Sequence, residues 1–447
     1  MIKKLLIANR GEIVSRIIRT CKDMGISTVA VYSEPDKNMP YLDIADNSVL
    51  IGQANPLESY LNIEALINAA IKTKSDAIHP GYGFLSERGT FAKAVEKAGL
   101  IWVGPSSETL KKISSKSYCR HIANKVNVPV IPGTLKPISD SDAILTYGKK
   151  HGWPLFLKLD KGGGGKGIEI IKNEREIKEA FKRAISIGKM AFGSSDCYIE
   201  RLIKNPRHIE IQFIADKKGK CICLGERECS LQRRCQKIIE EAPFTDITEQ
   251  ERQTLFERTK RIVREIGYTG AGTIENLRDA DGNFYFMEIN ARLQVEHPIT
   301  EFVTGTDIVK WQLSIAAGEK LDCEQKDIKI KGHSIEARVY AENPKTFIPS
   351  PGSISFISLP KNDKNIRIDH ALKKNLNIPP YYDPLLAKVI SYGTNRAEAT
   401  RLLIAALQNC RIKGIETTIP VNLAILNHPD YLAGKIDTKF IDKILNH

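Results

Sequence analysis

The sequence predicts an α/β protein, α+β in part, that is divided into two or three domains. Its 447 residues exceed the length at which a single hydrophobic core stops growing. Strand and helix patterns alternate near the N-terminus, and strand patterns are prominent in the remainder. The composition, 42% hydrophobic and 27% charged without a low-complexity tract, excludes a disordered chain.

Residues 1–113 form the first predicted domain, a small doubly wound α/β unit. Short apolar runs at 4–8 and 27–32 have the pattern of strands, and apolar residues at helical spacing lie between them. The alternation continues to about residue 103. A turn-rich segment, HPGYGFLSE at 79–87, has two glycines that would let the backbone approach a ligand; a plain tight connection is the alternative.

A glycine-rich hairpin marks the second predicted domain, residues 114–330. Two apolar strand patterns flank the glycines at 162–165. Unhindered backbone N–H groups and flanking lysines suit a loop that covers phosphates, so we expect a lid within about 131–203. Ile168 stands where a Walker A loop needs lysine, which excludes that loop, and a ligand-free surface hairpin is the alternative.

Strand patterns resume after Gly332. A helix rich in alanine and leucine follows at 397–407. Together they predict a third, β-rich domain over residues 331–447.

Acidic and amide side chains form a candidate metal site in the segment FYFMEINARLQVEHP, 284–298. A hairpin turn near 280–282 would place Glu275 opposite Glu288, and facing like charges destabilise a strand pair unless a cation lies between them. These two residues and Asn290 offer only oxygen ligands, which favours Mg²⁺ or Mn²⁺ holding substrate phosphates over zinc. If extended, the segment would gather five polar residues on one face, with a solvated strand face as the alternative: Glu288, Asn290, Arg292, Gln294 and Glu296.

A second polar run, ERECSLQRRCQKIIEEAP at 226–243, is dense in arginine, glutamine and lysine. Such side chains suit an anion pocket, and a solvated surface segment is the alternative. Four cysteines occur in and just before this run, at 221, 223, 229 and 235. Their spacing lacks the paired CxxC knuckles of a zinc site, so we expect no zinc there.

The net charge indicates which binding partners the protein can have, and the cysteines indicate its cellular compartment. A net charge of +13 favours anionic ligands, but the lysines and arginines are scattered, which argues against nucleic acid. Nine cysteines at irregular spacings predict a reduced, intracellular protein. The sequence has neither a signal core nor an apolar span that could cross a bilayer, so we expect a cytoplasmic protein without a membrane partner.

Taken together, these motifs resemble the biotin carboxylase family of ATP-grasp ligases over essentially the full chain, from IANRGEI at residue 7 to the C-terminal helix. The motifs occur in the family's order and near its usual separations: HPGYGFLSE (79–87), NPRHIEIQ (205–212), ERECSLQRR (226–234), KIIEEAP (237–243), YFMEINARLQVEHP (285–298) and PSPG (349–352). The resemblance implies a central ATP-grasp domain with a glycine-rich lid. It also implies a C–N bond-forming ligase that carboxylates biotin with ATP, bicarbonate and Mg²⁺ or Mn²⁺.

The resemblance implies a nucleotide site in which two lysines hold the phosphates, a glycine lid closes over them, and the segment 200–203 contacts adenine. The implied ATP-binding residues are Lys116, Lys158, Gly164, Gly165, Glu200, Arg201, Leu202, Ile203, His208, Gln232, Cys235, Glu275 and Glu288. The implied metal ligands are Glu275, Glu288 and Asn290, the same three that the hairpin argument selects.

The resemblance also implies a bicarbonate pocket and a biotin site. The bicarbonate residues are Lys237, Arg292, Gln294, Val295 and Glu296, and the catalytic set is Arg292, Glu296, Lys237 and Arg338. Glu296 corresponds to the general base, which suits a carboxylate beside cations that hold an anion losing its proton. Arg338 would stabilise an enolate-like oxygen of biotin, and Tyr82 would lie near biotin.

Four positions depart from the family pattern. Cys235 stands where a histidine is usual, and Arg201 replaces a lysine in the adenine segment. Lys161 replaces a small residue of the lid, and Ser115 replaces an aspartate. None belongs to the metal or bicarbonate set, so we expect an altered nucleotide affinity in an active enzyme.

Several alternatives stay open. An ATP-grasp ligase resembling carbamoyl-phosphate synthase also phosphorylates bicarbonate, and a non-catalytic nucleotide-binding regulatory subunit would retain the fold. The sequence has no AMKM-like attachment segment, so we expect biotin on a separate biotin carboxyl carrier protein that works with carboxyltransferase subunits. Acetyl-CoA carboxylase, in fatty-acid synthesis, is the first expectation for the whole complex, with pyruvate or propionyl-CoA carboxylase as alternatives. The resemblance also implies a homodimer.

Overall fold

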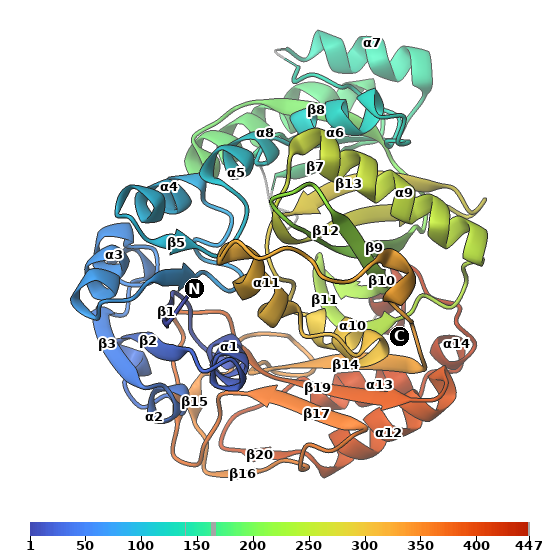
Figure 1. The fold of residues 1–447 in the computed structure, drawn as a ribbon. Helices are drawn as coiled ribbons and strands as arrows, with labels where there is room; N and C mark the ends of the chain where they lie inside the picture. Colours follow the sequence, from blue (N-terminus) through green and yellow to red (C-terminus); the bar gives the residue numbers. More distant parts are fainter. Residues whose placement is uncertain (139, 162–166, 446–447) are drawn as a thin grey trace.

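The N-terminal region folds around a five-stranded parallel sheet. The computed structural model, which describes residues 1–138, 140–161 and 167–445, orders these strands β3-β2-β1-β4-β5 (Figure 1). The strands are β1 (Lys4–Ile7), β2 (Ser27–Ser33), β3 (Asn47–Gly52), β4 (Ala77–His79) and β5 (Ile101–Trp102). The helices are α1 (Glu12–Asp23), α2 (Tyr41–Ile44), α3 (Ile63–Lys72), α4 (Gly89–Lys97) and α5 (Ser107–Ile113). The central strand β1 is almost entirely buried, as its unbroken apolar run predicts, and the predicted doubly wound unit is confirmed.

The strand order of this sheet changes direction between β1 and β4, and the loops that follow these two strands meet there. Asn9, after β1, donates from Nδ2 to the carbonyl oxygens of Pro80 and Tyr82 at 2.7 Å each. Carboxyl ends of strands at such a point form a ligand crevice in open α/β sheets. The loop after β4 reaches the central region through Glu87, whose Oε1 accepts from the Ala291 backbone N–H at 3.0 Å.

The two strands that flank the glycine run lie in a small subdomain with a hydrophobic core of its own, at the top of Figure 1. Its antiparallel sheet has the order β7-β6-β8, and Lys158 pairs with Ile168 across the two strands that flank the run. The elements are α7 (Asp142–His151), β6 (Leu155–Leu159), β7 (Ile168–Ile171), α8 (Ile177–Phe192) and β8 (Cys197–Arg201). The preceding helix α6 (Lys116–Lys125) packs instead in the core shared by the N-terminal and central regions. The predicted lid glycines Gly164 and Gly165 lie outside the described residues.

An eight-stranded antiparallel sheet, of order β13-β12-β9-β10-β11-β14-β19-β17, forms the rest of the scaffold (Figure 1). Its strands are β9 (Arg207–Ala215), β10 (Cys221–Arg233), β11 (Gln236–Ala242), β12 (Gly270–Arg278), β13 (Phe284–Asn290), β14 (His333–Tyr340), β17 (Ile366–His370) and β19 (Leu385–Gly393). The helices around it are α9 (Glu249–Ile266), α10 (His297–Thr304), α11 (Ile308–Ala316), α12 (Arg396–Asn409), α13 (Ile419–Leu426), α14 (Pro429–Leu432) and α15 (Phe440–Leu445). Two small ribbons complete the fold: β15 (Gly352–Ser353) with β18 (Asn377–Ile378), and β16 (Phe356–Ser358) with β20 (Arg411–Lys413).

The large sheet continues from the central region into the C-terminal region. The joint is the antiparallel pair of β11 and β14, in which Glu240 faces Glu336 and Ile239 faces Ala337. These strands lie on opposite sides of residue 330 in the sequence. The sheet therefore brings side chains from both regions onto one continuous surface.

The segment 284–298 is extended only in its first half, which corrects the expectation of a single strand face. The strand β13 ends at Asn290, a turn follows, and α10 begins at His297. Pro298 lies in the first turn of α10, where its missing N–H costs nothing because the first four N–H groups of a helix have no internal partner. Residues 291–296 thus approach the site as a loop.

Two further sequence expectations concern the helices and the thiols. Among the described helices, none combines the length and the apolar character needed to cross a bilayer. All nine cysteines are free thiols. The predicted helix at 397–407 is α12.

Candidate active site

Lys237, on β11, lies at the centre of the candidate active site. Its Nζ donates to Glu296 Oε1 at 2.6 Å, to Glu210 Oε2 at 2.7 Å and to Glu275 Oε1 at 3.0 Å. The three carboxylates are buried. Burial opposes the charge of the ammonium group, but the surrounding acids hold the pKa of Lys237 well above its usual value. The site thus contains one fixed cation among three acids.

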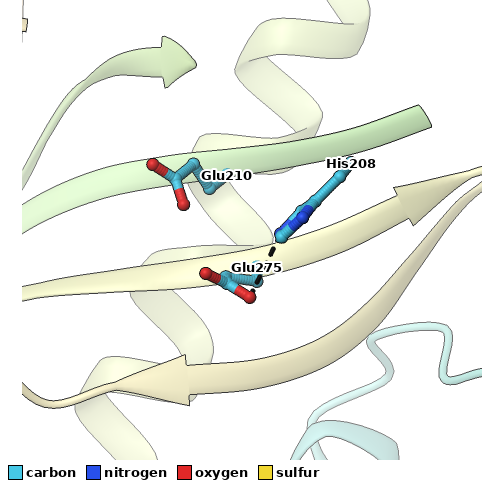
Figure 2. A group of neighbouring side chains, drawn as sticks. All are labelled: His208, Glu210 and Glu275. Carbon is cyan, nitrogen blue, oxygen red and sulfur yellow. Dashed lines mark ion pairs between the residues drawn. The ribbon is translucent and has the colours of Figure 1, made fainter. Parts of the chain in front are cut away.

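Figure 2 shows His208 and Glu210 on β9 with Glu275 on the adjacent β12. His208 Nε2 lies 3.1 Å from Glu275 Oε2, and one ligand atom from each residue falls within 4.8 Å of the others. This geometry suits a cation. The Lys237 ammonium already contacts both glutamates, so we assign no metal to this trio.

The predicted hairpin across β12 and β13 is confirmed, because Glu275 pairs directly with Glu288. Burial raises the pKa of Glu275, but Lys237 and His208 outweigh burial and hold this pKa well below its ordinary range. Glu288 is partly exposed, and its Oε2 lies 2.7 Å from Lys116 Nζ. Two facing carboxylates with an all-oxygen donor set fit a hard divalent cation such as Mg²⁺.

Glu296 follows β13 in the loop before α10 and lies between two cations. Its Oε1 accepts from Lys237, and its Oε2 accepts from Arg338 Nη2 at 2.9 Å. Burial raises the pKa of Glu296, but Lys237, Arg338 and Arg227 overcome burial and hold this pKa well below its ordinary range. Glu296 is therefore an anion at neutral pH, able to accept a proton from a bound acid.

The loop before α10 also surrounds the Arg292 guanidinium group with polar side chains. Arg292 Nη1 donates to Gln294 Oε1 at 2.7 Å, and its Nε lies 3.2 Å from Glu87 Oε2. Asn290 Oδ1 lies 3.4 Å from Arg292 Nη2, so the predicted third metal ligand adjoins this guanidinium group. The carbonyl oxygen of Val295 accepts from Lys388 Nζ at 2.8 Å. The structure thus places the predicted bicarbonate residues around one loop and Lys237.

Some of the predicted nucleotide residues lie along β6, β8, β9 and β10, and Leu202 and Ile203 follow β8. Of the others that the structure describes, Lys116 begins α6, Cys235 lies between β10 and β11, and Glu275 and Glu288 are on β12 and β13. Lys158 Nζ lies 2.5 Å from Glu200 Oε2, and Arg120 also pairs with this carboxylate. Gln232 Nε2 lies 3.5 Å from His208 Nδ1. The adenine segment begins at the end of β8, where Glu200 is buried, Arg201 is exposed, and Leu202 and Ile203 are partly buried.

Cys235 lies in the turn between β10 and β11, where it is exposed and has a φ of 65°. Lys158, Glu288 and Lys116 influence the charge of its thiol, and partial burial, the largest influence, raises the pKa of the thiol. The departure from the family pattern therefore lies beside the lysines proposed for the phosphates.

Tyr82 is hydrogen-bonded through its hydroxyl group to Glu12. Lys388 Nζ lies 3.2 Å from Glu12 Oε1, so Tyr82 belongs to the same polar cluster as the Val295 carbonyl. Burial and Glu12 raise the pKa of the Tyr82 hydroxyl well above its usual value. Tyr82 is thus a neutral side chain on the N-terminal side of the site.

Sequence reasoning missed several residues that complete the site. Glu210 lies between His208 and Gln212 on β9, and the period-two alternation of NPRHIEIQ could have identified it. Glu87 ends the motif HPGYGFLSE. Lys388 and Glu240 carry no local signal, because distant strands bring them to the site.

The fold and the site define a class of protein. Two lysines paired with glutamates, two facing carboxylates on a hairpin and a small antiparallel subdomain beside a large antiparallel sheet fit an ATP-dependent ligase. Three family models match successive parts of the chain. "Biotin carboxylase, N-terminal domain" matches residues 1–110, "Carbamoyl-phosphate synthase L chain, ATP binding domain" matches 115–324, and "Biotin carboxylase C-terminal domain" matches 336–443. The chain belongs to the biotin carboxylase family.

Relatives and solved structures support this placement along the whole chain. The chain is 45% identical to "Biotin carboxylase 2" of Bacillus subtilis over 100% of both chains. It superposes on a biotin carboxylase from Campylobacter jejuni with a TM-score of 0.97 and 42% identity, covering 99% of each chain. The biotin carboxylase domain dimer of a 2-oxoglutarate carboxylase from Hydrogenobacter thermophilus, solved with MgADP, ADP and bicarbonate, matches with a TM-score of 0.96, 42% identity and coverages of 99% and 98%. The predicted fold class and the predicted ligase activity, ATP-dependent carboxylation of biotin, are confirmed.

Proposed function

We propose that the chain carboxylates biotin on a separate carrier protein, with Glu296 as the general base. The observation that carries this proposal is the position of Glu296 between Lys237 and Arg338 at 2.6 and 2.9 Å. A buried, ionised carboxylate between cations suits an acid–base role on a small anion that binds beside it.

In this proposal, Arg292, Gln294 and the Val295 backbone hold bicarbonate near Lys237. Glu296 takes the bicarbonate proton, and the freed oxygen attacks the γ-phosphorus of ATP, so ADP leaves and carboxyphosphate forms. Lys116 and Lys158 hold the phosphates during this step, and Mg²⁺ bound by Glu275, Glu288 and Asn290 would neutralise phosphate charge.

The second half of the reaction transfers the carboxyl group. Carboxyphosphate breaks down to CO₂ and phosphate, and the phosphate accepts the N1′ proton of biotin. Arg338 stabilises the enolate-like ureido oxygen, and N1′ attacks CO₂ to form carboxybiotin. Tyr82 lies at the edge of the proposed biotin position.

We also propose partners and a biological setting. Carrier protein and carboxyltransferase subunits complete the reaction, the enzyme acts as a homodimer, and acetyl-CoA carboxylase in fatty-acid synthesis is the first assignment for the complex. The solved 2-oxoglutarate carboxylase relative shows that the same subunit type serves other acceptors, and pyruvate and propionyl-CoA are further candidates. The free thiols support a cytoplasmic setting.

Stimulation of ATP turnover tests the proposed reaction directly. With Mg²⁺ and bicarbonate present, we expect free biotin to raise the rate of phosphate release from ATP, and ammonia to have no effect. Stimulation by ammonia alone would instead support a ligase of the carbamoyl-phosphate type. No bicarbonate-dependent turnover at all would support a non-catalytic nucleotide-binding subunit.

The cysteine at position 235, where the family usually has a histidine, predicts an altered nucleotide affinity. We expect Cys235→His to tighten ADP binding about threefold to tenfold, because the imidazole would add one hydrogen-bonding group to the phosphate side of the site. Histidine also tolerates the positive φ of this position. Isothermal titration with MgADP measures the change, and Cys323→His, remote from the site, is the matched control. Equal affinities for Cys235→His and the wild-type enzyme would contradict the prediction.

A further inference from the structure

Two glutamates face each other where the central and C-terminal regions join. Glu240 on β11 and Glu336 on β14 are paired residues of the large sheet, and both are completely buried. Glu240 Oε1 accepts a hydrogen bond from Arg338 Nε at 2.6 Å. The other oxygen of Glu240 and both oxygens of Glu336 are buried without a hydrogen-bond partner among the described residues.

The surroundings make two ionised carboxylates at this position costly. Next to Glu240 and Glu336 on the same sheet face, α10 packs Ile299 and Val303 against the sheet residues Ala242 and Ile390, which keeps this side dry. A buried carboxylate without a hydrogen bond costs several kcal/mol when ionised, and two such carboxylates opposite one another repel as well. The charged and titratable groups that interact with the pair are Arg338, Lys237, Lys388, Glu296 and Tyr82. Glu12, Asp369 and His297 surround Lys388.

We propose that Glu240 and Glu336 share one proton, and that this proton-sharing pair positions Arg338 beside Glu296 for the carboxylation of biotin. A protonated Glu336 is a hydrogen-bond donor, and the free oxygen of Glu240 is the acceptor that it lacks. One proton on Glu336 then gives both residues a hydrogen bond between their buried oxygens. Glu240 keeps its negative charge, which pairs with the Arg338 guanidinium group. The proposal deepens the proposed function and rests on it.

The electrostatics of the two groups agree with this geometry. Burial raises the pKa of Glu240 to about 7 against the lowering effect of Arg338. Burial likewise raises the pKa of Glu336 well above its ordinary value against the lowering effect of Lys388. Because the two carboxyl groups interact, they titrate as a pair. At neutral pH the pair therefore holds a proton that isolated glutamates would have released.

The pair matters for catalysis because Arg338 contacts both Glu240 and Glu296. Its Nε donates to Glu240, and its Nη2 donates to Glu296. Glu240 Oε1 contacts both Nε and Nη2 of Arg338, and Glu296 contacts the same Nη2, so Glu240 helps to hold the guanidinium group beside the proposed base. Glu240 and Glu336 are thus positioning residues, and neither touches the proposed substrates.

Infrared spectroscopy of the full-length protein tests the shared proton independently of the reaction. At pH 7 we expect a carbonyl stretching band of a protonated, buried carboxylic acid that shifts in D₂O. Glu336→Gln is expected to remove this band. Glu241→Gln, which alters the neighbouring buried carboxylate bonded to Arg396, is the matched control and should leave the band intact. A wild-type protein without the band, or a band that survives in Glu336→Gln, overturns the proposal.

Kinetics test the positioning role. We expect Glu240→Gln to lower biotin-dependent ATP turnover about tenfold more than biotin-independent turnover, since a neutral amide replaces a charge-assisted bond to Arg338. The wild-type biotin-dependent rate should fall as the pH rises through the titration of the pair, and Glu336→Gln should flatten this fall. Equal losses of both turnovers in Glu240→Gln, or an unchanged alkaline limb in Glu336→Gln, contradict the positioning role. If the wild type shows no biotin stimulation, the proposed function fails, while the infrared result still decides the shared proton.

Discussion

Replacing Glu296 by alanine is expected to lower bicarbonate-dependent ATP cleavage about a thousandfold while MgADP still binds. The carboxylate is the only acceptor on the loop before α10 that both Lys237 and Arg338 contact among the described residues. Without it, no ionised oxygen remains between these two cations to take the bicarbonate proton. Initial rates of phosphate release and calorimetric titration with MgADP measure the two effects separately.

Glu226→Ala is the matched control for this experiment. Glu226 is an equally buried carboxylate of the same sheet, but its partner is Arg252 on α9, away from the proposed substrates. We expect this variant to lose stability and to retain ATP cleavage. Normal bicarbonate-dependent cleavage in Glu296→Ala would assign the base to another residue.

Lys237→Met is expected to lower ATP cleavage by more than about a hundredfold and to destabilise the fold by about 3–5 kcal/mol. The ammonium group is the shared partner of Glu210, Glu275 and Glu296, and its loss leaves buried carboxylates without their counter-charge. Methionine preserves the volume of the side chain, so the effect reports the charge.

The pH dependence of this stability loss has a definite sign. In the wild type, the pKa values of Glu275 and Glu296 are held low, so their contribution to stability is present at neutral pH and is lost only in acid. In Lys237→Met, burial dominates and raises both pKa values, so the folded state regains stability as the pH falls toward 5. Thermal unfolding at pH 8 and pH 5 should show a smaller deficit at pH 5. Lys260→Met on α9 is the control, and a deficit that is equal at both pH values would refute the explanation.

Local pattern was enough to predict the hairpin that carries the proposed metal ligands. The turn residues around Gly282 bring Glu275 to within one residue of Glu288, and a one-residue shift between Glu275 and Asn276, which alternation does not predict, aligns the two glutamates. The same alternation failed beyond Asn290, because polar residues at period two also occur in a loop. Pro298 was the available signal that a helix was about to begin.

Contacts between distant segments could not be predicted in this way. Glu240 and Glu336 are 96 positions apart in numbering and meet only because β11 pairs with β14. Lys388 reaches the carbonyl oxygen of Val295 from a further strand. Such pairings depend on the order of strands in the sheet, and composition and local periodicity carry no information about that order.

The continuous large sheet limits how far this enzyme is modular. Because β11 and β14 share a ladder of backbone hydrogen bonds, the C-terminal region contributes Arg338 to the same surface that carries Lys237. Exchanging the C-terminal region with that of another member would preserve the catalytic geometry only if the register of this one strand pair were inherited with it. The central and C-terminal regions therefore evolve under a shared constraint, which is the pairing of four residues of β11 with four residues of β14.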